Sequence, residues 1–306
     1  MRFTVQLPTH RVDEFEEFAS GEAVSEMARA AEQAGFDACF VTEHPIPTDR
    51  WLRTGGHHAL DPYVALSFAA AATTRLRVQT NIAVLAYRNP FLTAKAVASL
   101  DVLSGGRVIL GVAAGYLEGE FEALGVPFDE RNELTDEALS ILRRAWSEDG
   151  LALEARHFRA SGNTMRPRPR QRPHPPLWIG GNSRRAIRRA VDHGDGWIPF
   201  PTVGIASERI RTAAIESVAD LAERISYARR YAAEVGREGP LDICFVPFGL
   251  SMHRREGVDP ARFRDSVAEL AELGVTWLTL ALPGDTRDAF CAAVRRFGDE
   301  VLAALD

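Results

Sequence analysis

Two short stretches of the chain carry side chains that are able to do chemistry. The first, Thr42-Glu43-His44-Pro45, directly follows an apolar run. An imidazole has an unperturbed pKa of about 6.5 and therefore exchanges a proton readily at neutral pH. A histidine before a proline at a strand end is equally often structural, so the position of His44 in the fold decides between the two roles.

The second stretch, Gly180-Gly181-Asn182-Ser183, precedes a segment rich in arginine. Glycines let the backbone turn closely, and the free N–H groups and the dipole of a helix N-terminus hold an anion. The Ser183 hydroxyl offers one more hydrogen bond. By itself such a turn is most often an ordinary helix start. Arg184 and Arg185 lie in the first turn and are better placed than the later arginines to meet a phosphate.

The sequence offers little for a metal site. His57 and His58 are adjacent, so on an extended chain their side chains point in opposite directions, and no carboxylate cluster with ligand spacing accompanies them. The three cysteines are widely spaced and each lies in an apolar run, which is typical of core thiols. We therefore expect no metal site.

The elements that must position these residues follow a repeating pattern. Short apolar runs rich in β-branched residues alternate with longer stretches of helical period, as in successive βα units. The strand candidates are 2–7, 38–42, 76–85, 107–113, 177–180, 196–200, 241–250 and 277–282. Eight βα units in about 300 residues predict an α/β fold, a closed (β/α)8 TIM barrel, with a doubly wound open sheet as the alternative.

Two connections, after strand 4 and around strands 5 and 6, are longer than an ordinary loop and are read as insertions. About sixty residues separate the fourth and fifth strands, with a helix at about 129–147 and an Arg-Pro stretch at 166–176 that we expect to be extended and polyproline-like. The alternate arginines of this stretch are expected to be solvated. The second long connection runs from 201 to about 216. No linker divides the chain, so we expect residues 1–306 to form a single domain with an insertion at about 150–176.

Composition excludes several classes of protein. The chain has 306 residues, 46% of them hydrophobic and 25% charged, which suffices for a large core. Its net charge is −6 and Lys95 is the one lysine among 36 basic residues, a bias that reflects a GC-rich genome. Neither a nucleic-acid surface nor a membrane span of about 20 apolar residues is expected. The N-terminus does not resemble a signal peptide, which predicts a cytoplasmic protein.

Several further segments occur in a fixed order over roughly residues 2–200. They are 87–90, 100–107, 110–115, 120–125, 129–131, 175–183 and 194–197. In this order they resemble the luciferase-like flavin and deazaflavin oxidoreductases, a barrel superfamily that includes bacterial luciferase, FMN monooxygenases and enzymes that use coenzyme F420. The last strands fit the superfamily only by their pattern.

This resemblance implies where a cofactor would lie. Glu43 and His44 would lie beside the deazaflavin ring, with His44 exchanging a proton and Glu43 orienting it or touching the ring edge. A non-proline cis peptide that faces the ring would join Ala83 and Val84. The small residues after the fourth strand would leave room for a flat ring, and the Gly-Gly turn would bind phosphate. The implied cofactor contacts are Glu43, His44, Ala83, Val84, Ala86, Ala114, Gly115, Gly180, Gly181, Asn182, Ser183, Arg184 and Arg185.

One position departs from the family pattern. In F420-dependent sugar-phosphate dehydrogenases a glutamate that serves as general base follows the Ala-Gly of the fourth strand, but this chain has Tyr116 there. Glu118 and Glu120 are nearby but out of register. Lys95, within a helix, is not a plausible ligand for a substrate phosphate. We therefore expect a different substrate, with His44 and Tyr116 as the candidate catalytic residues and proton sources.

These observations predict an F420-dependent oxidoreductase that transfers a hydride between the deazaflavin ring and a small organic substrate. The alternatives are an FMN-dependent monooxygenase, which would need a flavin reductase as partner, and a barrel that binds ligands without a cofactor. The acidic residue before His44 and the GC-rich source favour F420. The resemblance also implies a homodimer that forms through helices on the flank of the barrel.

Overall fold

The computed structural model describes residues 1–202, 211–249 and 260–305. Eight parallel strands close into a barrel in the order β1, β2, β3, β4, β7, β8, β9, β10. Their bounds are β1 (Arg2–Gln6), β2 (Ala38–Val41), β3 (Arg77–Val84), β4 (Val108–Ala113), β7 (Leu177–Gly180), β8 (Gly196–Ile198), β9 (Asp242–Phe245) and β10 (Trp277–Leu280). Each strand lies within a predicted run, although residue 250 of one run lies outside the described residues. The TIM barrel is confirmed and the open sheet is wrong.

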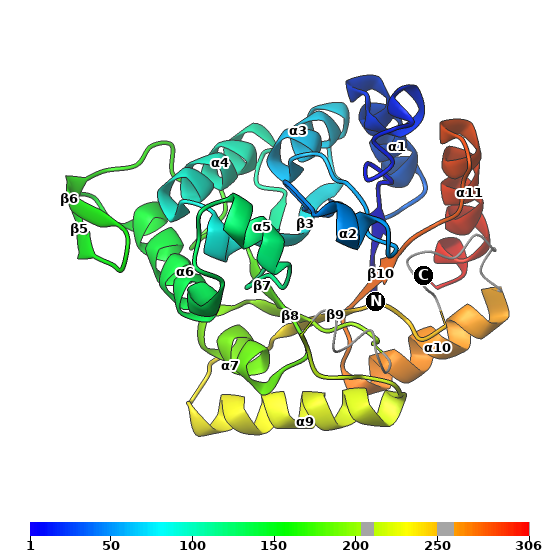
Figure 1. The fold of residues 1–306 in the computed structure, drawn as a ribbon. Coiled ribbons are helices and arrows are strands. Elements are labelled where there is room, and N and C mark those ends of the chain that lie inside the picture. The colour runs from blue at the N-terminus through cyan, green and yellow to red at the C-terminus, as the bar shows by residue number, and fades with distance from the viewer. Residues whose placement is uncertain (203–210, 250–259, 306) are drawn as a thin grey trace.

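Helices surround the barrel (Figure 1). Several begin as the sequence predicts; for example, the Asp61 carboxylate accepts the N–H groups of Tyr63 and Val64 at the start of α3. The α-helices are α1 (Gly21–Gln33), α2 (Asp49–Leu52), α3 (Pro62–Ala72), α4 (Pro90–Leu103), α5 (Glu118–Ala123), α6 (Arg131–Ser147), α7 (Arg184–His193), α9 (Val218–Glu234), α10 (Pro260–Leu273) and α11 (Arg287–Glu300). The shorter helical turns are η1 (Phe15–Ala19), η2 (Leu85–Tyr87), η3 (Phe128–Glu130) and η4 (Leu302–Ala304).

The hydrophobic core has two layers. Inside the barrel Trp178 and Trp277 meet with their ring centroids 5.1 Å apart. Gly196 makes room for them, since a Cβ at this position would lie 2.4 Å from Cδ1 of Trp178. A larger cluster fills the space between strands and helices. The three cysteines are free and buried, and burial raises the pKa of Cys39 and Cys244 to about 12, which confirms the prediction of inert core thiols.

The insertion before β7 contains an antiparallel hairpin that the sequence analysis does not predict. β5 (Leu151–Glu154) and β6 (Arg159–Asn163) pair with each other and project from the barrel at the left of Figure 1. Within these strands only Leu151 and Ala160 are buried, so the apolar pattern that would reveal them is nearly absent.

The Arg-Pro stretch contains no helix or strand, as predicted, but it is not a continuous polyproline helix. The bonds Arg166–Pro167 and Arg172–Pro173 are cis, and the segment runs as a series of bends. The fully buried Asp101 of α4 anchors it, because its carboxylate accepts the backbone N–H of Gln171 at 2.9 Å and its side-chain amide at 2.7 Å. Of the second long connection, residues 203–210 lie outside the described residues, and Thr202 and Ile215 form a bridge at its two ends.

Within the described ranges, no helix combines the length and the apolar character that crossing a membrane requires.

Candidate functional site

His44 lies in the mouth of the barrel, three residues beyond the end of β2, with 10% of its side chain exposed. The ring centroids of Trp51, His57 and Tyr116 lie 4.4, 4.9 and 6.2 Å from its own. Its Nδ1 lies 3.4 Å from Oε2 of Glu120. The structure thus brings together the two predicted catalytic residues, His44 and Tyr116, and surrounds them with two further rings and a carboxylate.

The segment after His44 folds back over the mouth. Trp51, from the short helix α2, packs against Gly56 so closely that a Cβ on this glycine would lie 2.2 Å from Cε3 of the indole. The Nε2 atom of His57 lies 3.2 Å from the Thr42 hydroxyl oxygen, which ties the returning loop to the end of β2. The rings of Trp51 and His57 therefore cover part of the barrel mouth.

The Glu43 side chain has a different task from the one that the sequence predicts. Its carboxylate, 2% exposed, accepts the backbone N–H of Val84 at 2.6 Å and ion-pairs with Arg88, which also contacts Asp61 at 3.0 Å. Burial raises the pKa of Glu43 above its ordinary value, although Arg88 and the Val84 N–H oppose this shift. Both carboxylate oxygens are thus engaged in joining the end of β2 to the end of β3.

The predicted cis peptide is wrong in position. It lies at Asn81–Ile82 and not at Ala83–Val84. The pairing of β3 with β4 is irregular just before Ala83, so the strand bulges at Asn81 and Ile82, which remain partly exposed. Ala83 and Val84 have already returned to the regular ladder and are buried, as is Ala86. The backbone irregularity therefore comes two residues earlier than expected.

Small residues cover the neighbouring strand ends. A Cβ on Gly180 would lie 3.3 Å from Cγ2 of Ile82 and 3.6 Å from Cβ of Ala113, so β3, β4 and β7 come together here. Ala113, Ala114 and Gly115 remain partly exposed, and Gly115 has a φ of +82° that favours glycine. This surface without bulky side chains fits a flat ring system.

Asn182 uses its whole side chain to hold the turn after β7. Its amide nitrogen donates to the carbonyls of Phe200 and Ala213, both at 2.9 Å, and its oxygen accepts the Phe200 N–H at 3.1 Å. Ser183 caps α7 by accepting the N–H of Ala186. The predicted Gly-Gly turn exists, therefore, but these two side chains serve the fold. The backbone N–H groups of Gly181 and Asn182 are also engaged, by the Ile198 carbonyl and the Thr212 hydroxyl, so the N–H groups at the start of α7 are the donors that remain.

The two arginines of the first turn contact neighbouring helices. Arg185 pairs with Glu133 at 2.9 Å and with Asp136 at 3.0 Å on α6, and the guanidinium of Arg184 lies 5.2 Å from the ring centroid of Tyr227 on α9. Their predicted contact with a phosphate would require them to leave these partners.

The residues after β4 separate into different roles. Tyr116 is largely buried, and burial together with the charge of Glu120 raises its pKa to about 12, so its phenol is protonated at neutral pH. Glu118 is exposed and pairs with Arg211 at 2.9 Å. Glu120 is 2% exposed and faces His44. The adjacent Phe121 is fully buried but lies on a different face of α5, so the sequence gives no local signal for the burial of Glu120.

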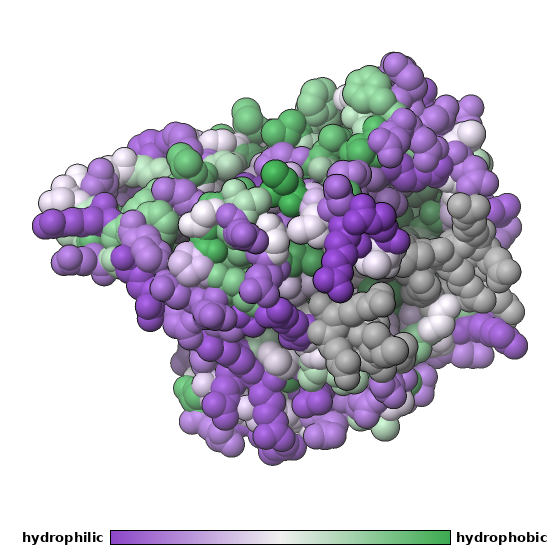
Figure 2. Space-filling view, viewed as in Figure 1, coloured by the Kyte–Doolittle hydropathy of each residue, from purple (hydrophilic) through white to green (hydrophobic). Residues whose placement is uncertain are grey.

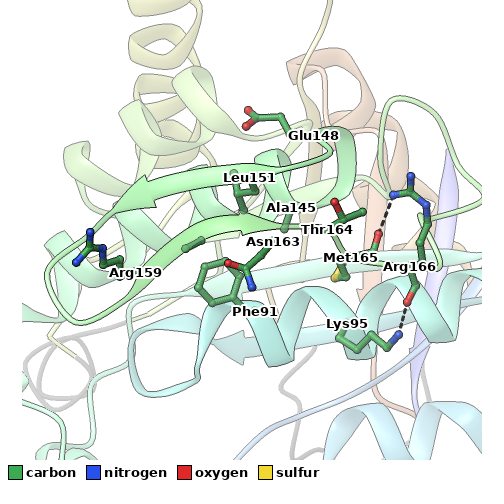
Figure 3. Close-up of a pocket in the computed structure, with 11 residues that line it drawn as sticks. Phe91, Lys95, Ala145, Glu148, Leu151, Arg159, Asn163, Thr164, Met165 and Arg166 are labelled. Carbon is green, nitrogen blue, oxygen red and sulfur yellow. Dashed lines mark hydrogen bonds between the residues drawn. The ribbon is translucent and has the colours of Figure 1, made fainter.

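A cavity of about 410 Å³ lies on the flank of the barrel and not at the strand ends (Figure 3). It lies between α4, α6 and the β5–β6 hairpin, and Lys95 donates there to the carbonyl of Arg166. Arg166 and Arg168 pair with Asp149 at 2.7 and 2.9 Å. Within the described residues no group of three potential metal ligands occurs.

The fold and the site define a (β/α)8 barrel with a histidine-lined mouth and a small-residue surface at the strand ends. A family model described as luciferase-like monooxygenase matches residues 1–244. The chain therefore belongs to the luciferase-like monooxygenase family, whose members are oxidoreductases and monooxygenases.

The relatives include enzymes with either cofactor. An uncharacterized protein of Mycobacterium tuberculosis is 29% identical over 292 residues, which cover 88% of this chain and 90% of that protein. An F420-dependent glucose-6-phosphate dehydrogenase of Intrasporangium calvum is 28% identical over 291 residues (88% and 84%). An FMNH2-dependent dimethylsulfone monooxygenase of Pseudomonas putida is 34% identical over 164 residues (52% and 43%). Among solved structures, a monooxygenase from Streptomyces bottropensis superposes over 100% of both chains with a TM-score of 0.78 and 21% identity.

The ion pair at the strand ends yields a stability prediction. Glu43→Gln should lower the free energy of unfolding by about 3 kcal/mol, because it leaves the half-buried Arg88 guanidinium without its main partner. Asp61→Asn is the matched control, since asparagine still caps α3 and the lost contact is more exposed. Urea denaturation of both variants measures the difference. Equal losses would contradict the structural role assigned to Glu43.

Proposed function

We propose that the protein is an F420-dependent oxidoreductase that transfers a hydride between the deazaflavin ring and a small organic substrate. The observation that carries this proposal is the placement of His44. The His44 imidazole contacts a buried carboxylate and lies in the barrel mouth near Tyr116. The ends of β3, β4 and β7 line the same mouth with small residues. A proton source in the same mouth as a surface for a flat ring is what hydride transfer to an electron-poor carbonyl or double bond requires.

The residues that would bind the cofactor are those whose polar groups or surfaces are not already used by contacts within the fold. The ring would lie over Ala113, Ala114 and Gly180, which carry a methyl group or no side chain, and beside Ile82. The phosphate would accept backbone N–H groups at the start of α7, where the positive end of the helix dipole adds attraction. Arg184 and Arg185 would contribute only by leaving α9 and α6.

The catalytic roles are divided between two side chains. When bound, the coenzyme supplies the hydride donor or acceptor. His44 exchanges a proton with the substrate, and the protonated phenol of Tyr116 donates a hydrogen bond to the developing oxyanion. Tyr116 in place of a glutamate argues against sugar-phosphate oxidation, although several relatives are named F420-dependent glucose-6-phosphate dehydrogenases.

An FMN-dependent monooxygenase is the second candidate. It is favoured by the 34% identity, over 164 residues, to an FMNH2-dependent dimethylsulfone monooxygenase. The same small-residue surface and phosphate turn would hold FMN, and a flavin reductase would then be the partner.

Cofactor binding tests the proposal directly. Titration of the purified protein with F420 and, separately, with FMN should give the tighter binding for F420, read by fluorescence and by calorimetry. Tighter binding of FMN would replace the proposal by its alternative. If neither cofactor binds, the protein is a binding barrel without a redox cofactor.

His44→Ala should retain the affinity for F420 and slow hydride transfer by roughly 100-fold or more, because general acid–base catalysis contributes on that scale. Single-turnover absorbance changes of bound F420 measure the rate. An unchanged rate would remove His44 from the catalytic residues.

We also propose that the protein is a homodimer that forms through α3 and α4. No charged residue occurs in α3, and its exposed side includes Val64 and Phe68, which are 60% and 49% exposed. On α4, Leu92 and Leu103 are 70% and 81% exposed. Figure 2 shows hydrophobic surface along the upper edge of the molecule, over these helices. A helix that is apolar on all sides is normally buried, and a second copy of the chain would cover it.

Leu92→Glu should convert the dimer into a monomer, because it would place a charge in the apolar interface. Val235→Glu is the control, since this residue is 47% exposed at the end of α9, on the other side of the barrel. Light scattering coupled to size-exclusion chromatography reports the mass. A wild-type protein that is monomeric at micromolar concentration would refute the dimer.

A further inference from the structure

Glu120 is a buried carboxylate with one available hydrogen-bond donor. The residue is 2% exposed, and its Oε2 lies 3.4 Å from Nδ1 of His44. Its second oxygen, Oε1, is buried and has no hydrogen-bond partner within the described part of the chain. A buried carboxylate that is left without donors is strongly destabilising. The His44 ring is therefore the one hydrogen-bond partner of this carboxylate among the described residues.

The packing of α5 fixes the place of Glu120. The adjacent Phe121 is fully buried, with the rings of Tyr87 and Phe128 each 5.1 Å from its own. Gly119 lets α5 approach the loop after β2, since a Cβ at this position would lie 2.3 Å from Cγ2 of Thr48. A bulkier residue at Gly119 would push α5, and with it Glu120, away from His44.

The other charged and titratable groups near this pair do not replace His44 as the donor. Arg88 is engaged by Glu43 and Asp61. The phenols of Tyr87 and Tyr116 are protonated at neutral pH, because burial and the charges of nearby carboxylates raise the pKa of each, but neither hydroxyl donates a hydrogen bond to Glu120 within the described residues. The His57 ring lies edge-on to the His44 ring, with the centroids 4.9 Å apart, and its Nε2 lies 3.2 Å from the Thr42 hydroxyl oxygen.

The acceptor character of the carboxylate decides the protonation of the imidazole. An ionised carboxylate only accepts hydrogen bonds, so the facing Nδ1 must carry a hydrogen. The opposite tautomer, with hydrogen on Nε2, would direct the lone pair of Nδ1 at the lone pairs of Glu120. In the favoured tautomer Nε2 is left free to exchange a proton.

We propose that Glu120 is a positioning residue that holds His44 in the Nδ1–H tautomer, so that the catalytic proton is exchanged at Nε2. This inference deepens the proposed function and rests on it for the use of that proton. When Nε2 gains a proton, the ring becomes an imidazolium whose charge Glu120 balances. When Nε2 releases the proton to the substrate, the ring returns to the Nδ1–H form. The F420-dependent sugar-phosphate dehydrogenases have a glutamate at the position of Tyr116. In this chain Glu120 provides the carboxylate near the site, and it acts through His44.

The tautomer is measured without any cofactor. In protein labelled with ¹⁵N histidine, long-range proton–nitrogen NMR spectra distinguish a protonated Nδ1 from a protonated Nε2, and the His44 signals are identified by their loss in His44→Ala. The expected result for the neutral imidazole is hydrogen on Nδ1 and none on Nε2. Hydrogen on Nε2 in the wild-type protein would overturn the proposal, whatever the variants do.

Two variants of Glu120 distinguish the effect of its hydrogen-bond acceptor from the effect of its negative charge. Glu120→Leu should shift His44 toward the Nε2–H tautomer and slow hydride transfer by at least about 10-fold while F420 affinity is unchanged. Glu120→Gln keeps an acceptor and should retain the tautomer with a smaller loss of rate. Glu118→Leu, on the exposed side of α5, should change neither. A Glu120→Leu protein that keeps the Nδ1–H form would overturn the proposal.

The positioning role of Glu120 and the proposed function can be refuted independently of each other. If the NMR spectra show the Nδ1–H tautomer and its dependence on Glu120, but the wild-type protein transfers no hydride with F420, the positioning of His44 stands and the assignment of the cofactor is wrong.

Discussion

The buried Glu43 carboxylate determines the shape of the barrel mouth. It follows β2 directly, yet its oxygens are bound to Val84 and Arg88, which belong to the end of β3 and the turn after it. A buried carboxylate needs such partners, because removal from water is costly for an unpaired charge. Through this contact the chain after β2 is fixed relative to the bulge at Asn81 and Ile82.

The two acidic residues at the mouth, Glu43 and Glu120, have different roles because they contact different partners. Glu43 is paired with a permanently charged guanidinium and also accepts the Val84 N–H, so both of its oxygens are occupied. Glu120 is paired with an imidazole, whose charge can change at neutral pH. The first arrangement suits a structural joint and the second suits acid–base chemistry, although the residue type is the same.

The parts of the fold that the sequence predicts are those with strong local signals. Most barrel strands are short runs that are rich in apolar residues and buried on both faces, as in β2, β4 and β7, and such runs are visible without any knowledge of their neighbours. The β5–β6 hairpin was missed because only Leu151 and Ala160 are buried in it. The cis peptide was misplaced by two residues because a bulge depends on how β3 pairs with β4, which the sequence of β3 does not show.

The site divides in the same way. The sequence by itself determined the barrel, the family resemblance, the His44 position at a strand end and the Gly-Gly turn before α7, since each is read from short local motifs or from their order along the chain. Only the tertiary structure decided that Glu43 binds β3, that Asn182 and Arg185 serve the fold, and that Glu120 faces His44. His44 and Glu120 are 76 residues apart, and their contact exists because β2 and α5 open onto the same end of one barrel. Long-range contacts of this kind are set by barrel closure and packing, which no local pattern of residues encodes.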